Sequence, residues 1–131
     1  MKKDLWKGFD EEQISKMPMD QYLKLVDSRC RRTIERLNVN PRLKQFIEEV
    51  RATKKANPKK AIKTHVRDAV ILPEWLGMTF MVHNGKEFKR VEISIEKMGH
   101  RLGDYSHSTG RVLHSGPGVG ATRGSKFVPL K

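Results

Sequence analysis

The chain has 131 residues, with 27 Lys or Arg against 15 Asp or Glu, and therefore a formal net charge of +12. This length suits one domain with an arm or a tail and excludes a large two-domain enzyme. The longest apolar run, residues 69–72, is far shorter than the roughly 20 residues that cross a bilayer, and the N-terminus lacks the apolar stretch of a signal peptide. We therefore expect a soluble, cytoplasmic protein without membrane contacts. The single cysteine, Cys30, allows neither an internal disulfide nor the usual zinc site, and we expect it to be buried.

The positive charge is concentrated in two segments. Residues 28–67 hold thirteen basic and three acidic residues, a net charge of +10, and residues 105–131 hold four basic and no acidic residues. Residues 1–27 and 68–104 each have a net charge of −1. Long basic stretches repel themselves unless a polyanion neutralises them, which favours a nucleic-acid partner. A merely solvated basic surface is the alternative, although solvated surfaces usually mix both signs.

Three amphipathic helices are predicted in the first half of the chain. Apolar residues recur at helical spacing in residues 19–26, 30–37 and 43–50, and arginines occupy the opposite face of the second helix. Asn40 is suited to cap the third helix and Pro41 to open it, and we expect this helix to run to about Lys55. These apolar stripes are typical of a hydrophobic core rather than of a ligand site.

The apolar pattern changes to that of strands after residue 62. Residues 69–72 (AVIL) predict a short strand, and residues 78–82 and 87–95 predict two more on either side of a type I′ turn at Asn84-Gly85. Ser94 is expected to cap a short helix that ends at Gly103. Beyond Tyr105 the chain has too few apolar residues to fold alone.

The histidines, carboxylates and C-terminal glycines do not predict catalysis. The glycines at 116, 118, 120 and 124 lack the spacing of a Walker A loop and the strand and helix of a dinucleotide site. The five histidines lack metal-ligand spacing, and no nucleophile stands in a known catalytic motif. Glu92 and Glu96 are expected to be solvated rather than to act as an acid and base pair. We therefore expect no enzymatic activity, no cofactor and no metal.

Binding of nucleic acid remains, without the motifs of its common small modules. The sequence has no GxxG of a KH domain, no aromatic RNP strand of an RRM and no Cys2His2 spacing. Because the core should take several of the nine aromatic residues, a base-stacking platform is not expected. Recognition of the phosphate backbone of structured RNA by Arg and Lys is therefore the predicted mode.

The order of motifs in the second half of the chain is specific. It runs KTHVRD, ILPEWLG, HNGK, VEI, MGHRLGDY and, at the end, HSGPGVGATRGSKFVPLK. This series closely resembles the small-ribosomal-subunit protein family that is numbered nineteen in the universal nomenclature. The three N-terminal helices and the C-terminal tail are similar to its archaeal and eukaryotic branch.

The resemblance implies a structural protein in the head of the small subunit. It would bind the 3′ major domain of the small-subunit ribosomal RNA, beside the protein numbered thirteen and near an intersubunit bridge to a large-subunit protein, with its tail close to the transfer RNAs. By matched position, the resemblance implies ribosomal RNA contacts at Lys63, Thr64, His65, Arg67, Lys86, Gly99, His100 and Arg101. The sequence departs from the family pattern at Trp75, at His83 and at Ser115-Gly116.

Together these observations predict an α+β protein with a small three-stranded sheet and short helices. Residues 1–60 would form a partly basic helical extension, residues 61–105 the α+β core and residues 106–131 an extended, glycine-rich basic tail. The charge pattern adds further candidate RNA-binding residues: Arg29, Arg31, Arg32, Arg36, Lys54, Lys55, Lys59, Lys60 and Arg111. The candidate tail contacts near transfer RNA are Gly118, Gly120, Thr122, Arg123, Lys126 and Lys131. A free RNA chaperone or regulator is the alternative function.

Overall fold

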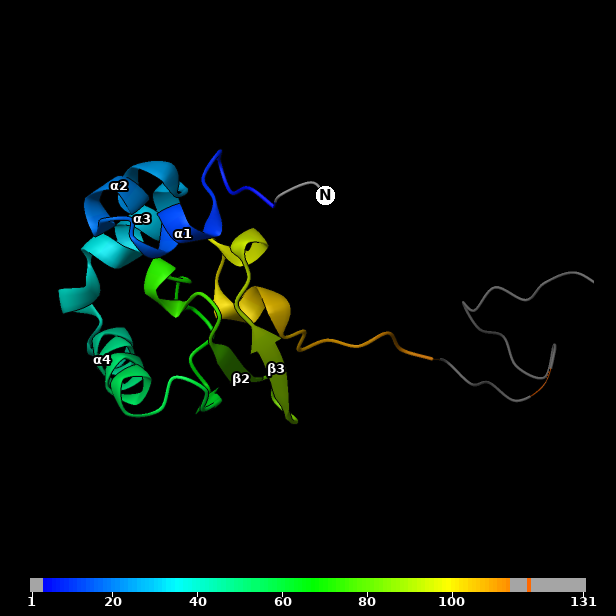
Figure 1. Cartoon of the computed structure of the whole chain (residues 1–131). Coiled ribbons are helices and arrows are strands. Elements are labelled where there is room, and N and C mark those ends of the chain that lie inside the picture. The colour runs from blue at the N-terminus through cyan, green and yellow to red at the C-terminus, as the bar shows by residue number, and fades with distance from the viewer. Residues whose placement is uncertain (1–3, 114–117, 119–131) are drawn as a thin grey trace, which may run out of the picture.

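The computed structural model describes residues 4–113 and residue 118. The helices are α1 (Glu11–Ser15), α2 (Met19–Leu25), α3 (Ser28–Glu35) and α4 (Pro41–Ala56), and the strands are β1 (Ile62–Thr64), β2 (Thr79–His83) and β3 (Phe88–Glu92). Four 3₁₀ turns complete the fold: η1 (Leu37–Val39), η2 (Pro73–Trp75), η3 (Ile95–Lys97) and η4 (Leu102–Tyr105). Helices α1 to α3 cluster together above α4, and the sheet lies beside α4 (Figure 1). The α+β class with a three-stranded sheet is therefore confirmed, while residues 114–117 and 119–131 of the predicted tail lie outside the described residues.

The three predicted helices are present as α2, α3 and α4. Asn40 caps α4 as expected, because its side-chain oxygen accepts a hydrogen bond from the Leu43 backbone N–H at 3.4 Å. The apolar stripes are turned inward, and the buried residues they contribute are Tyr22, Val26, Cys30, Leu43, Phe46, Ile47 and Val50. Helix α1, a single short turn that buries Ile14, was not expected from the sequence.

The sheet has the order β1-β2-β3. Strand β1 runs parallel to β2, and β2 runs antiparallel to β3. The predicted strands around residue 84 are confirmed as β2 and β3, with Phe80 opposite Val91 on the buried face. One face of the sheet thus closes the core, as the alternation of apolar and polar residues indicates.

The prediction of a strand at residues 69–72 is wrong. This segment is fully buried, but it forms only an isolated bridge between Val70 and Arg101, with hydrogen bonds from Ile71 N–H to His100 O and from Leu102 N–H to Ala69 O. The first strand is β1 instead, which pairs with β2. An apolar run of four residues marks burial, and burial alone does not distinguish a strand from an irregular segment.

The predicted type I′ turn at Asn84-Gly85 is also wrong. A type I′ turn needs two residues with positive φ, whereas Gly85, with a φ of 100°, is the one such residue between β2 and β3. Asn84 instead accepts hydrogen bonds on its side-chain oxygen from the N–H groups of Lys86 and Glu87, at 3.0 and 2.8 Å. The side chain of Asn84 thus organises a four-residue connection between the paired residues His83 and Phe88.

The expected helix over residues 95–103 is replaced by the two 3₁₀ turns η3 and η4. The Ser94 side chain makes no cap hydrogen bond, and Gly103 lies within η4 rather than ending a helix. Between the turns, Gly99 has a φ of 79°, a backbone conformation that side chains rarely adopt. This glycine therefore interrupts the helical backbone where a continuous helix was expected.

The N-terminal helices and the sheet share one hydrophobic core. Tyr22 of α2 is fully buried, its hydroxyl donates a hydrogen bond to the Ile71 carbonyl, and it accepts one from the Gly99 N–H at 3.2 Å. Cys30 of α3 is buried as predicted, and its thiol donates to the Gly99 carbonyl at 3.4 Å. The helices are thus joined to the 3₁₀ segment by buried polar contacts as well as by apolar packing.

Stability should fall at alkaline pH because of Tyr22. Burial raises the pKa of the Tyr22 phenol, and the hydrogen bond from Gly99 lowers it only in part. The folded pKa therefore exceeds the unfolded value near 10, so the contribution of Tyr22 is complete below about pH 10 and is lost as the pH rises further. We expect a slope of about −1.4 kcal/mol per pH unit from this residue above pH 10. Urea unfolding of the wild type and Tyr22→Phe between pH 8 and 11.5 would measure the difference.

Lysine ionisation affects both proteins and cancels in this comparison. Tyr105→Phe is the comparison at a half-buried phenol. Burial and the carboxylates of Asp104 and Glu96 raise the pKa of Tyr105 less than burial raises the pKa of Tyr22, so Tyr105→Phe should reduce the alkaline loss by less than Tyr22→Phe. The explanation would be excluded if Tyr22→Phe and the wild type lost stability at the same rate above pH 10.

Candidate nucleic-acid interface

A basin of about 710 Å³ opens between α3, the start of α4 and the η4 turn. We call it the arginine basin, because its walls carry Arg29, Arg32, Arg36 and Arg101. The first three lie on one face of α3 and at its C-terminal end, since their spacing of three and four residues matches the helical repeat. The opposite face of α3 carries the buried Cys30, so the core orients the arginines outward.

Three of these arginines are free to meet a ligand. Within the part of the chain that the structure describes, no carboxylate or hydrogen-bond acceptor pairs with the guanidinium groups of Arg29, Arg32 or Arg36. Arg101 is anchored instead, donating to the Asp68 carbonyl and the Thr33 hydroxyl, both at 2.8 Å. Unpaired guanidinium groups around an open basin are suited to bind phosphate.

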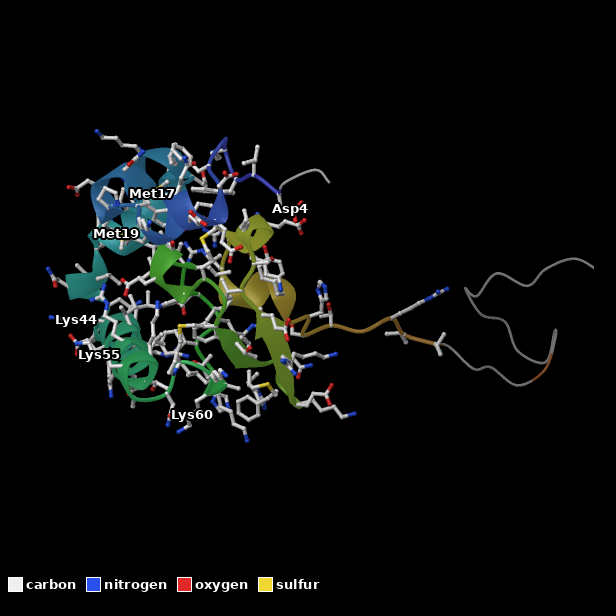
Figure 2. The ribbon with its side chains drawn as sticks, in the orientation of Figure 1. Asp4, Met17, Met19, Lys44, Lys55 and Lys60 are labelled. Atoms are coloured by element: carbon white, nitrogen blue, oxygen red, sulfur yellow. The ribbon has the colours of Figure 1, made fainter. Side chains whose placement is uncertain are left out.

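A second group of basic residues lies along α4 and the connection after it. Figure 2 shows Lys44 and Lys55 on α4 and Lys60 beyond it, all at the periphery of the molecule. Among the predicted residues, Lys55, Lys59 and Lys60 are exposed. Lys54 differs in having a partner within the protein, because its ammonium group donates to the backbone carbonyl of Glu74. The carboxylate of the same Glu74 accepts two hydrogen bonds from Arg51, at 2.7 and 3.1 Å.

Three further predicted RNA-binding residues, besides Arg101 and Lys54, make contacts inside the protein. Arg31 donates to the carbonyls of Leu23 and Val26 at 2.8 and 3.2 Å, which joins α3 to α2. Thr64 is buried, and its hydroxyl accepts a hydrogen bond from the Val66 N–H at 3.0 Å.

Arg67 is the third of these residues. Its guanidinium group donates to the carbonyls of His83 and Gly103 at 2.7 and 2.9 Å and to that of Ser106. It therefore connects the end of β2 to η4. The sequence showed the charge of Arg67 but not the distant carbonyl groups that it meets.

The remaining predicted residues are distributed over the sheet, the 3₁₀ segment and the C-terminal region. Lys63, His65 and Lys86 are exposed at one end of the sheet, and His100 is exposed beside the ring of Tyr105. Gly99 packs against the N-terminal region, where a Cβ atom would lie 3.5 Å from the Trp6 ring. Arg111 and Gly118 are exposed, while Gly120, Thr122, Arg123, Lys126, Lys131 and the departure at Ser115-Gly116 lie outside the described residues.

Trp75, one of the departures from the family pattern, is a core residue. It is fully buried, with its ring 5.8 Å from that of Phe46 and 5.1 Å from that of Phe80. Its indole N–H has no hydrogen-bond partner within the described region. This departure therefore changes the core and not the basic surface.

The described residues contain no cluster of three or more His, Cys, Asp or Glu side chains that could hold a metal ion. In residues 4–113, no helix has the length and apolar character needed to span a membrane. The described residues thus form a basic surface on an α+β scaffold, which is the geometry of a protein that binds a polyanion.

Comparison with known proteins identifies the family. The model of the family described as Ribosomal protein S19 matches residues 32–114. The chain is 41% identical over 130 residues to "Small ribosomal subunit protein uS19" of Methanococcus maripaludis strain S2, which covers 96% of this chain and 80% of that protein. It is 40% identical, with the same coverage, to the protein of that name from strain C5. The chain therefore belongs to the S19 family of small-subunit ribosomal proteins, in its archaeal and eukaryotic branch, and the resemblance found in the motifs is confirmed.

Proposed function

We propose that this protein is a structural constituent of the small ribosomal subunit that binds ribosomal RNA and supports translation, without catalytic activity of its own. The observation that supports the proposal is the arginine basin: three of its arginines project from one face of α3 and have no partner among the residues that the structure describes. Phosphate oxygens of RNA would accept hydrogen bonds from these guanidinium groups and neutralise the charge of the +10 segment. Membership of the S19 family supports ribosomal RNA as the polyanion.

The position within the ribosome is part of the same proposal. The resemblance in motifs supports binding to the 3′ major domain in the subunit head, beside the protein numbered thirteen and near a bridge to the large subunit. The same resemblance supports RNA contacts at the exposed residues Lys63, Lys86 and His100. It also supports a position near transfer RNA for the tail residues Arg123 and Lys126. Arg67 and Thr64 would then contribute by holding the shape of this surface, because their polar groups bind the protein backbone.

The proposal predicts stable incorporation into small subunits. When tagged protein is expressed in cells and the lysate is spun through a high-salt sucrose cushion, we expect it in the pellet with the small subunit. High salt removes proteins held only by exposed charge, because such binding weakens steeply with ionic strength. Recovery of the whole protein in the soluble fraction would contradict incorporation.

A free RNA chaperone or regulator remains the alternative, because phosphate contacts carry no sequence information. A salt titration with a head-domain ribosomal RNA fragment and with an unrelated hairpin of equal length distinguishes the two functions. A structural ribosomal protein should bind the fragment more tightly at every salt concentration, whereas a chaperone should bind both RNAs alike.

A further inference from the structure

Three rings meet at one end of the sheet, and none of them was expected to form a platform. His65 follows β1, His83 ends β2 and Phe88 begins β3. His83 and Phe88 are directly paired, and His65 stands one residue beyond the paired Thr64 and Val82. The ring centroids of His65 and His83 are 4.5 Å apart. The centroid of the Phe88 ring lies 5.3 Å from that of His65 and 4.9 Å from that of His83. We call these three side chains the ring cluster.

The ring cluster lies on the outer face of the sheet. Along β1 and β2 the side chains alternate, so the buried Thr64 and Val82 point to the core while His65 and His83 point away from it. His65 is exposed, and His83 and Phe88 are half-buried. The next row of this outer face carries Lys63, Met81 and Arg90. An aromatic cluster, in which the Phe88 ring stands nearly perpendicular to both imidazole rings, therefore lies beside cationic side chains.

The rings are also held in position. The His83 ring nitrogen Nδ1 accepts a hydrogen bond from the Gly85 N–H at 3.0 Å, and the His83 carbonyl accepts one from Arg67 at 2.7 Å. Arg42 donates to the His65 carbonyl at 3.3 Å. The Lys63 ammonium group lies 5.5 Å from the centre of the Phe88 ring, within the range of a cation–π contact. A preorganised surface binds a flat ligand with little loss of side-chain entropy.

We propose that the ring cluster stacks on an unpaired base of RNA, with Lys63 contacting an adjacent phosphate. This inference rests on the proposed function and deepens it, because it adds a contact to a base where only phosphate recognition was expected. Stacking on His and Phe rings is a common way for proteins to hold splayed-out bases of RNA. The base would stack on the exposed ring of His65. The tilted ring of His83 and the edge-to-face ring of Phe88 would hold the His65 ring in place.

The test uses the full chain and two hairpin RNAs of about 20 nucleotides. The hairpins are identical except that one carries a single-nucleotide bulge of 2-aminopurine, whose fluorescence is quenched by stacking. We expect the wild-type protein to quench the bulge on binding, and His65→Ala to abolish the quench and to weaken binding of the bulged hairpin roughly 10-fold. His65→Ala should weaken binding of the unbulged hairpin less than binding of the bulged hairpin, because the unbulged hairpin offers no unpaired base to stack on the ring.

Two further variants complete the test. His65→Phe should restore both the quench and the affinity, since it keeps a ring without the imidazole nitrogens. His107→Ala is the matched control, because His107 is exposed and has no ring contact in residues 4–113. Thermal unfolding should show the same midpoint for the wild type and all three variants.

Several results would overturn the inference. Equal binding of both hairpins by the wild type without a quench would exclude stacking and leave phosphate binding intact. Failure of His65→Phe to restore affinity would indicate a hydrogen bond or a charge instead of a stacked ring. Failure of the wild type to bind either hairpin at low salt would remove the proposed function itself and this inference with it.

Discussion

Arg67→Ala is expected to lower the free energy of unfolding by about 3 kcal/mol, the largest effect on stability that we expect from a charged residue of this protein. The guanidinium group of Arg67 donates to three carbonyls, those of His83, Gly103 and Ser106. Alanine would leave these acceptors without their donor in a half-buried site and would remove the guanidinium link between β2 and η4. Urea unfolding followed by circular dichroism would measure the loss.

Two comparisons separate geometry from charge. Arg67→Lys keeps the positive charge but cannot reach three carbonyls with one ammonium group, so we expect it to recover less than half of the loss. Arg90→Ala removes an exposed arginine that pairs with Glu92 at 2.6 Å and should change stability by less than about 0.5 kcal/mol. A loss from Arg67→Ala as small as that from Arg90→Ala would show that the three hydrogen bonds contribute little.

The triple replacement of Arg29, Arg32 and Arg36 by alanine is expected to have the largest effect on RNA binding. Each arginine that neutralises one phosphate adds about 0.7 to 0.9 to the slope of log affinity against log salt, so the slope should fall by roughly 2 to 3. At low salt we expect a loss of affinity on the order of 100-fold. Filter binding of a head-domain ribosomal RNA fragment at several salt concentrations would measure both quantities.

A matched control removes the same charge elsewhere. Lys16, Lys24 and Lys89 are exposed and lie outside the arginine basin, and only Lys89 has an ion pair, with Glu87 at 3.7 Å, among the described residues. Their replacement by alanine should change the slope by less than one. If both triple variants lost the same slope, the RNA would be held by the net charge of the protein and not by the arginine basin.

The fold was predictable from the sequence where the local signals, such as capping residues, and the pattern of buried residues indicate the same element. Helix α4 combines a capping Asn40, a first-turn Pro41 and four apolar residues at helical spacing, and each of these signals predicts the same element. The strands β2 and β3 were predictable from alternation. Residues 69–72 and 95–103 were not, because their conformations depend on pairing with each other across about 30 residues of chain. Such tertiary pairing leaves no local periodicity in the sequence.

The candidate site was predictable in its charge and not in its geometry. Counting charges located the +10 segment, but it could not distinguish the outward Arg29, Arg32 and Arg36 from Arg31, whose guanidinium group meets the backbone of α2. The helical repeat carries this signal, since Arg29, Arg32 and Arg36 share one face of α3. The ring cluster could not be predicted, because the parallel register that brings His65 beside His83 joins strands that are distant in sequence and leaves no local pattern.

The buried hydroxyl of Tyr22 has a consequence for synthesis of the chain. Its two partners, the Ile71 carbonyl and the Gly99 N–H, follow it by 49 and 77 residues. The N-terminal helices are made first, yet they cannot bury this tyrosine until the second half of the chain has been translated. Contacts so distant in sequence carry a large loop-closure entropy and slow folding. The nascent N-terminal helices therefore depend on the last-made part of the core, and folding is completed late in translation.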